Sequence, residues 1–370
     1  MEKAVYIEEI QTVSALGIEE AEKRKGYLSG QTSLRFNDEL DRFVGCIDNK
    51  YVLPSDSKYY SKLDRSVRLA LILSAKMRQS CTRINGQIGV SLGSSRGATE
   101  LLEGDYKAFM NKEDVRQLSS PTTTMGNISS WVAQDLSAFG PNVENSMTCS
   151  TAAQSILTAV AYLNSGMSAH FIAGGAEAAL TPFTMAQLDR LGIYSKAESQ
   201  AGNFDKLENT MVLGEGAGLL LLSNEPKNAK YAIKGVGYAI EPIVHPAALS
   251  SNGSCFQKAM TMAKGDHKID AIVMHAPGTK QGDLAELKAI HKVFGKETPL
   301  LTNNKWIIGH TFGASMLLSL EMAIFMLEHQ EFYAVNPHKS SGNENVQLNT
   351  ILVNSAGFGG NAVSLLIRKI

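Results

Sequence analysis

Residues 144–166 read ENSMTCSTAAQSILTAVAYLNSG, and within this stretch an extended segment passes directly into a helical pattern. A short extended segment ends at Thr148-Cys149-Ser150, and a run of small and apolar residues typical of a buried helix follows at once. Similar short β-branched runs, set among helical patterns, are QIGVS at 87–91, HFIA at 170–173 and IDAIVM at 269–274. This alternation predicts an α/β layered fold.

The chain also divides into two similar parts. A polar stretch with a proline, SNEPKN at 223–228, separates the apolar run GLLLL at 218–222 from a new extended segment that starts at Tyr231. Each part opens with an extended segment and closes with an apolar strand, so we expect an internal duplication, with halves at 1–223 and 224–370. The clearest predicted helices span 62–77, 152–163, 284–293 and 314–327.

Composition excludes several classes of protein. Lys and Arg number 35 against 36 Asp and Glu, so no global field favours nucleic acid or an anionic membrane. The four cysteines have neither disulfide-framework nor metal-pair spacing, and they predict reduced thiols in a cytoplasm. The N-terminal segment does not follow the plan of a signal peptide. The most apolar stretch, 316–327, is shorter than a membrane span, so a soluble protein is expected.

Cys149 is the first candidate for chemistry. A thiol at a helix N-terminus lies near free backbone N–H groups, which favour a thiolate and can also donate to an oxyanion. Free cysteine is, however, among the most buried residue types, so the local sequence alone favours an inert core thiol.

Two histidines and a glycine turn change that balance. His275 ends an apolar strand and begins APGTKQGD, and His310 lies in IIGHTFGAS before a long apolar helix. The other six histidines have no comparable surroundings. The turn at 357–360, GFGG, can bring backbone N–H groups close to a ligand while it exposes the ring of Phe358. Such junctions can converge on one cleft.

Five segments in this order resemble the successive landmarks of the β-ketoacyl-acyl-carrier-protein synthases, the condensing enzymes of fatty acid and polyketide assembly. They are TCSTAAQSI, VLGEGAGLLLL, HAPGTKQGD, NNKWIIGHTFGA and NSAGFGGNAVS. The resemblance covers essentially the whole chain. It implies a thiolase-like fold in which two duplicated α/β halves stack in a five-layer αβαβα arrangement, and it implies a homodimer. A heterodimer with a related synthase-like subunit is the alternative.

The resemblance also implies catalytic roles. Cys149 would be the nucleophile, and its backbone N–H would form an oxyanion hole together with that of Phe358. His275 and His310 would donate hydrogen bonds to the extender thioester as it loses carbon dioxide. Lys305 would support the site electrostatically.

Supporting residues follow from the same resemblance. Glu286 would be the ion partner of Lys305, Asp283 would support the site, and Phe358 would gate the acyl pocket. The family's His-Gly-Thr-Gly-Thr run departs here, because its first threonine is replaced by Pro277. Only Thr279 remains to bind pantetheine, and the effect of the proline is left open.

The implied reaction is decarboxylative Claisen condensation of an acyl-enzyme with malonyl-acyl carrier protein. It needs no metal and no permanently bound cofactor, since the phosphopantetheine arm arrives on the acyl carrier protein. GFGG lacks the second cysteine of thiolases, and His310 stands where initiating synthases have asparagine, so the elongating class is expected. Fatty acid and specialised polyketide or polyene pathways both remain open.

Two alternatives and one surface complete the expectations. The chain could be another thiolase-superfamily acyltransferase or a hydrolase, or a non-catalytic subunit that sets chain length for a sister synthase, although retention of Cys149 favours an active enzyme. Carrier proteins are acidic, so a basic patch is expected. Lys58, Lys62 and Arg65 match the docking segment of relatives, but an ordinary solvated helix face explains them equally well.

Overall fold

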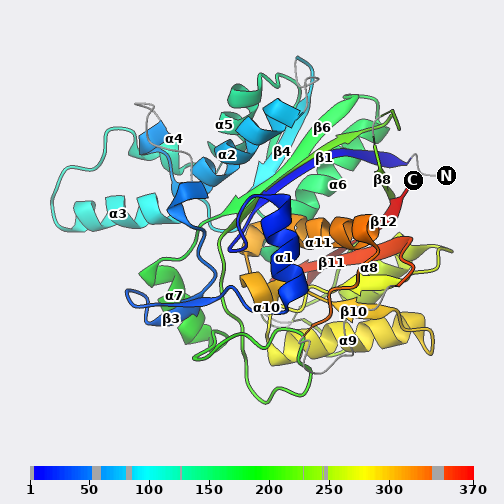
Figure 1. Cartoon of the computed structure of the whole chain (residues 1–370). Helices are drawn as coiled ribbons and strands as arrows, with labels where there is room; N and C mark the ends of the chain where they lie inside the picture. The colour runs from blue at the N-terminus through cyan, green and yellow to red at the C-terminus, as the bar shows by residue number, and fades with distance from the viewer. Residues whose placement is uncertain are drawn as a thin grey trace.

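The computed structural model describes residues 4–51, 60–80, 86–125, 127–227, 229–243, 245, 249–335 and 346–370. Ten of the described strands form one mixed sheet, in the order β10-β9-β11-β12-β8-β1-β7-β6-β4-β5 (Figure 1). The first five strands in chain order are β1 (Val5–Val13), β4 (Gly89–Gly93), β5 (Asn142–Asn145), β6 (His170–Glu177) and β7 (Gly216–Ser223). The second five are β8 (Tyr231–Ile240), β9 (Ala271–Val273), β10 (Leu300–Thr302), β11 (Thr350–Gly357) and β12 (Asn361–Lys369).

The two sets of strands have the same topology, which confirms the expected duplication. The order is β5-β4-β6-β7-β1 in the first set and β10-β9-β11-β12-β8 in the second. In both sets the outer three strands pair in parallel and the next two pairs are antiparallel. The sets join where residues 5–7 of β1 pair with residues 231–233 of β8.

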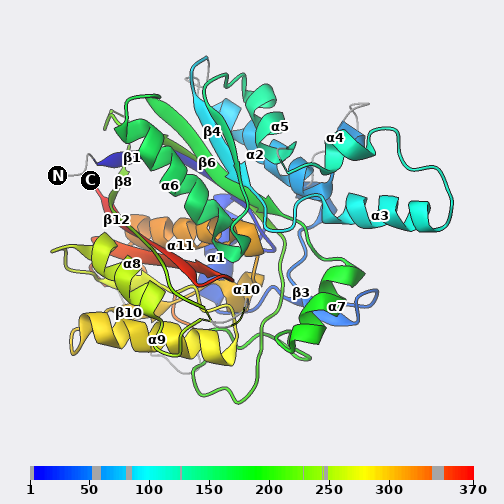
Figure 2. The same ribbon diagram turned by 180° about the vertical axis from the view of Figure 1, so that it is seen from behind.

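Two helices lie between the halves and form the central layer of the molecule. They are α6 (Thr151–Asn164) and α11 (Ser315–His329), which contact each other as well as strands of the sheet (Figure 2). By contrast, α2 (Arg65–Ser80) and α5 (Asn127–Leu136) cover the outer face of the first half. The outer face of the second half is covered by α8 (Ser254–Lys264), against which α9 (Lys280–Phe294) packs. The layers are therefore αβαβα.

The strand sequences explain this layering. Leu220 and Leu222 of β7 pack toward the central helices, whereas Leu219 and Leu221 pack toward α2 and α5. Because alternate side chains point to opposite faces, a strand covered on both sides needs apolar residues at every position. The run of four leucines meets that need.

Helix α11 is buried over most of its length. The stretch Phe312–His329 has the length and apolarity of a membrane span by those two criteria alone, but 89% of it is buried inside the fold. It is therefore a core helix of the central layer.

Smaller elements surround the layers. They are α1 (Glu20–Ser29), β2 (Arg35–Asn37), β3 (Arg42–Val44), η1 (Asn49–Tyr51), η2 (Tyr60–Lys62), α3 (Thr99–Met110), α4 (Ser119–Thr123), η3 (Thr148–Ser150), α7 (Pro182–Leu191), α10 (Lys305–Ile308) and η4 (Phe312–Ala314). The predicted helix 62–77 begins three residues later, at Arg65, because Lys62 ends the short turn η2.

Candidate active site

Cys149 lies in the turn between β5 and α6, with 7% of its surface exposed. The turn is tight: Thr148 has a φ of 51°, which is unusual for a residue with a branched side chain. Its position is fixed from the other half of the molecule. Ser150 donates its hydroxyl to the side chain of Asn361, and the end of β11 packs so closely that a Cβ on Gly357 would lie 2.1 Å from the Thr148 hydroxyl oxygen.

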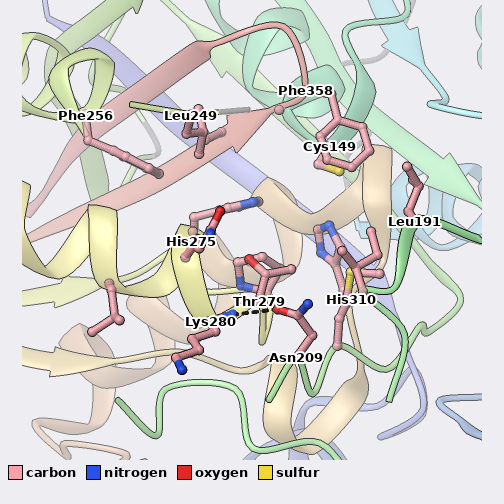
Figure 3. Close-up of a pocket in the computed structure, with 18 of the residues that line it drawn as sticks. Cys149, Leu191, Asn209, Leu249, Phe256, His275, Thr279, Lys280, His310 and Phe358 are labelled. Atoms are coloured by element: carbon pink, nitrogen blue, oxygen red, sulfur yellow. Dashed lines mark hydrogen bonds between the residues drawn. The ribbon is translucent and has the colours of Figure 1, made fainter. Parts of the chain in front are cut away.

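His275 and His310 reach the same place from the second half. His275 follows β9, and His310 follows α10, whose C-cap is Gly309 with a φ of 80°. The two rings meet edge to face, with centroids 5.4 Å apart. Both histidines and Cys149 line one pocket of 650 Å³, and Figure 3 shows the three side chains around it. The sequence prediction that these residues share a cleft is confirmed.

The ring of His310 is held in a defined orientation. Its Nδ1 lies 3.0 Å from the hydroxyl oxygen of Ser315, the first residue of α11. Its backbone N–H donates to Val212 at 2.7 Å, and its carbonyl accepts from Gly214 at 3.1 Å. The site histidine therefore joins the two halves through the landmark segment that precedes β7.

The loop that carries His275 is clamped by Glu286 of α9. The two carboxylate oxygens accept the backbone N–H groups of His275 and Ala276, each at 2.9 Å, and Asn354 donates to the same carboxylate at 3.0 Å. The clamp holds Ala276 at a φ of 23°, outside the favoured regions for alanine.

This clamp corrects the expected role of Glu286. We predicted an ion pair with Lys305, but the Lys305 ammonium donates to the carbonyl of Met274 at 3.3 Å and to Ser319 Oγ at 2.9 Å. Among the described residues Glu286 acts on Lys305 only through its field. The reason is that the backbone N–H groups of the histidine loop already occupy both carboxylate oxygens.

Asp283 is also part of a buried network. It forms an ion pair of 2.5 Å with Lys206, and it accepts the N–H of Gly278 at 3.2 Å. Asp283 thereby ties the histidine loop to the segment that precedes β7. Thr279 is the N-cap of α9, and it lines the pocket together with Pro277.

Burial controls the charge states in the site. It lowers the pKa of His310 to about 3 and that of His275 well below its ordinary value, helped by the positive charge of Lys305, so both imidazoles are neutral at pH 7. Burial also raises the pKa of the Cys149 thiol to about 12, with the negative charge of Glu177 acting in the same direction. The helix end does not produce a resting thiolate, because desolvation dominates.

Aromatic rings form part of the pocket wall. Phe358 follows β11 and lies beside Cys149, with 36% of its surface exposed (Figure 3). Phe312 has a φ of 38°, and its ring meets that of His310 edge to face with centroids 5.4 Å apart.

Glu177 is a buried residue that the sequence reasoning missed. It ends β6 and accepts four hydrogen bonds: from the Ser94 hydroxyl at 2.8 Å and from the N–H groups of Ser95, Arg96 and Gly313 at 2.8, 3.2 and 3.0 Å. Burial raises its pKa to about 7. An acidic residue at the end of the apolar run HFIAGGAE was the available signal, because a buried carboxylate needs donors.

The expected docking residues do not gather at the pocket. Arg65 forms an ion pair of 2.5 Å with the buried carboxylate of Glu215, with 20% of its side chain exposed. Lys62 is exposed in η2, and Lys58 lies outside the described residues. The basic groups that line the described pocket are instead His245, Lys280 and Lys288, besides the two buried histidines.

A cysteine facing two neutral imidazoles between duplicated α/β halves defines an acyltransferase of the thiolase fold. The chain belongs to the β-ketoacyl synthase family: the profile of the β-ketoacyl synthase N-terminal domain matches residues 17–228, and that of the C-terminal domain matches residues 231–337. It is a β-ketoacyl synthase by that membership.

Individual relatives agree over the full length. The chain is 27% identical to a 3-oxoacyl-[acyl-carrier-protein] synthase 1 of Buchnera aphidicola, over 99% of both proteins. A solved β-ketoacyl synthase from Burkholderia phymatum superposes with a TM-score of 0.87 at 23% identity, covering 100% of both chains. A ketosynthase in complex with its chain length factor, from Xenorhabdus doucetiae, gives 0.86 at 22% identity, covering 100% of this chain and 98% of that one.

Proposed function

We propose that this chain catalyses decarboxylative Claisen condensation, with Cys149 carrying the growing acyl group as a thioester. The observation that carries the proposal is the convergence of Cys149, His275 and His310 on one pocket, with both imidazoles uncharged. Only neutral imidazoles keep a ring nitrogen free to accept while the other donates. Cationic rings would also hold the extender carboxylate and oppose its loss.

The first step of the reaction loads the enzyme. Cys149 Sγ attacks the thioester carbonyl of the acyl carrier protein, the bond to the pantetheine sulfur breaks, and the thiol proton passes to that sulfur. The backbone N–H groups of Cys149 and Phe358 stabilise the tetrahedral oxyanion. Because the resting thiol is protonated, the proton must leave as the new bond forms, and the neutral imidazole beside it can relay it.

The second step releases carbon dioxide and forms the new carbon–carbon bond. His275 and His310 donate to the thioester oxygen of the malonyl group, so the electron pair of the broken bond is held as an enolate. The enolate carbon attacks the carbonyl of the acyl-enzyme, the bond to Cys149 Sγ breaks, and the Cys149 thiolate takes up a proton from solvent, since its own proton left with the carrier thiol in the first step. With His310 Nδ1 engaged by Ser315, its Nε2 is the atom left to donate. Lys305 supplies a positive field.

The carrier arm enters along the wall that holds Thr279. Thr279 is the proposed pantetheine contact, and Pro277 beside it offers no hydroxyl or N–H. The partner is an acyl carrier protein, whose arm is the only cofactor required. Docking through Lys58, Lys62 and Arg65 remains a proposal, and the ion pair of Arg65 with Glu215 makes Lys62 the better placed of the two described residues.

A homodimer is the proposed assembly, and two features support it. Strand β5 is the outermost strand of the described sheet, so one edge is open for pairing. Helix α3 projects from the rest of the molecule (Figure 1) and exposes Leu102, Tyr106, Phe109 and Met110. The proposed halves remain 1–223 and 224–370, and the proposed location is the cytoplasm.

One experiment tests the reaction directly. The purified chain is incubated with an acyl-acyl carrier protein, the acyl-enzyme is mapped by peptide mass spectrometry, and carbon dioxide release from malonyl-acyl carrier protein is measured. We expect acylation at Cys149, loss of condensation in Cys149→Ala, and no loss in the control Cys46→Ala, whose thiol is exposed outside the pocket. Condensation retained by Cys149→Ala would disprove the nucleophile.

The same experiment addresses a non-catalytic role. One solved neighbour is a ketosynthase in complex with its chain length factor, so a subunit that shapes a sister synthase is the second candidate. Such a subunit would take no acyl group at Cys149 and release no carbon dioxide alone. Comparing saturated fatty acyl with polyene or β-keto primers then decides between fatty acid and polyketide assembly.

A further inference from the structure

Lys305 differs from the other described lysines that are buried. Lys23 contacts the carboxylate of Glu321, and Lys206 contacts that of Asp283. Lys305, with 2% of its surface exposed, donates to Ser319 Oγ and to the Met274 carbonyl, and among the described residues neither of these hydrogen-bond partners is charged. A buried ammonium is normally paired with an anion, because desolvation is costly. Within the part of the chain that the structure describes, the Lys305 ammonium therefore has no carboxylate in contact.

The Ser319 hydroxyl has little freedom to move. Ser319 lies in α11, and 1% of its surface is exposed. Its oxygen is 2.9 Å from Lys305 Nζ and 3.4 Å from Asn304 Oδ1, which it approaches as a donor. Asn304 precedes Lys305 and is the N-cap of α10. The hydroxyl thus lies between the Lys305 ammonium and the side-chain oxygen of Asn304, the residue that precedes Lys305.

We propose that Ser319 is a positioning residue, whose hydroxyl, in place of a carboxylate, holds the Lys305 ammonium beside His275 and leaves its charge uncompensated by direct contact. This role of Ser319 contributes to catalysis only if the proposed condensation takes place, so in that respect it rests on the proposed function. The retained charge acts on neighbouring groups: it opposes protonation of both histidines and favours the thiolate of Cys149.

The arrangement sets the pH at which this charge is lost. Burial lowers the pKa of Lys305 to about 8, against the fields of Glu286, Asp283 and Cys149, which raise it. The titratable or charged groups around Lys305 and Ser319 are Glu286 and Asp283 of α9, Cys149 of η3, His275, His310, Tyr27 and Lys23 of α1, and Glu321 of α11. Removing an acceptor from the ammonium favours its neutral form, so losing the Ser319 hydroxyl moves the transition to lower pH.

The test is the pH dependence of Cys149 alkylation by iodoacetamide, followed on the full-length chain by mass spectrometry of its peptide. The alkylation rate rises with pH because the thiolate form of Cys149 becomes more populated. In the wild type this rise should flatten where Lys305 loses its charge, because a neutral Lys305 no longer favours the thiolate. In Ser319→Ala we expect that transition to move down by about one pH unit, the value of one hydrogen bond to a charged group. Ser319→Thr, which keeps the hydroxyl, should retain the wild-type transition.

Two further variants make the result decisive. Ser319→Asp gives the ammonium a carboxylate and should move the transition to higher pH, which keeps the test open if Ser319→Ala does not fold. Ser155→Ala is the matched control, because Ser155 is a buried helical serine of the central layer that does not contact Lys305. A wild-type transition in folded Ser319→Ala or Ser319→Asp would overturn the inference.

Alkylation needs no carrier protein, so failure of the inference and failure of the proposed function are separate results. If Ser319→Ala shifts alkylation but the wild type releases no carbon dioxide from malonyl-acyl carrier protein, the positioning of Lys305 stands and the condensation is wrong. If condensation is active, its alkaline limb should shift with the alkylation profile. If the enzyme condenses but the Ser319→Ala substitution changes neither the pH profile of alkylation nor that of condensation, the positioning role is refuted and the proposed function stands.

Discussion

The carboxylate of Glu286 accepts the backbone N–H of His275 at 2.9 Å, so a helix of the second half sets the position of a site histidine through its main chain. The ring itself stays free, since His275 Nδ1 is buried with no hydrogen-bond partner among the described residues. A clamp on the backbone leaves the imidazole available to a substrate.

Replacing Glu286 with glutamine tests this clamp. In Glu286→Gln an NH2 group replaces one of the two carboxylate oxygens. Because each oxygen accepts a backbone N–H, the new NH2 group faces another donor and one hydrogen bond is lost. We therefore expect the free energy of unfolding to fall by about 1–3 kcal/mol. Decarboxylation should fall more than acylation of Cys149. Urea unfolding and the two partial reactions measure this, with exposed Glu297→Gln as control. Equal stability of the two variants would contradict the clamp.

The buried histidines predict a pH dependence of stability. Because the folded-state pKa of His310 is about 3, the unfolded chain takes up a proton as pH falls below about 6.5 and the folded chain does not. The contribution of His310 to the free energy of unfolding is therefore complete above pH 6.5. It is lost at about 1.4 kcal/mol per pH unit as the pH falls toward 3. Urea unfolding of wild type and His310→Gln near pH 7 and pH 5 should show the wild type losing more, whereas exposed His291→Gln should follow the wild type.

The ion pair of Lys206 with Asp283 should matter for both the fold and the carrier arm. Lys206→Ala leaves a buried carboxylate without its cation, which costs about 3–5 kcal/mol. Because Asp283 also accepts from Gly278, the Thr279 loop should loosen and the KM for malonyl-acyl carrier protein should rise more than kcat falls. Thermal unfolding and steady-state kinetics measure the two effects. Lys196→Ala, exposed in the same segment, is the control.

Replacing Glu177 should lower the stability of the fold and raise the reactivity of the Cys149 thiol. Each carboxylate oxygen of Glu177 accepts two of the four hydrogen bonds, and Glu177→Gln replaces one of these oxygens by an NH2 donor, so the fold should be destabilised by about 1–3 kcal/mol. The substitution also removes a negative charge that raises the pKa of Cys149, so the thiol should be alkylated faster. Thermal unfolding and iodoacetamide kinetics on the same sample measure both. A destabilised protein with a slower thiol would contradict the electrostatic role of Glu177.

Much of the site could be read from local pattern. His275 follows a strand, Cys149 lies just before a helix, and His310 lies in a glycine-rich turn before another helix, so all three side chains are at element ends, where α/β folds build pockets. The duplicated sheet follows similarly, because strands buried on both faces, such as GLLLL, read as continuous apolar runs in each half. Resemblance of the five ordered segments supplied the condensing chemistry.

Other features depended on distances that a sequence does not contain. The partner of Glu286 proved to be the backbone of its own half, and Arg65 turned to Glu215 across 150 residues of chain. The protonated state of the Cys149 thiol follows from burial, since desolvation depends on what surrounds a group in three dimensions and outweighs the helix end.

The layered α/β class and the duplication could therefore be predicted from the sequence, together with the candidate site residues, because apolar periodicity and turn residues act locally along the chain. The set of groups that share the pocket, the donors that each carboxylate binds and the charge states of these groups depend on the three-dimensional packing. Those properties arise from packing and desolvation between residues that lie far apart in sequence, and Ser319 beside Lys305 is the clearest case.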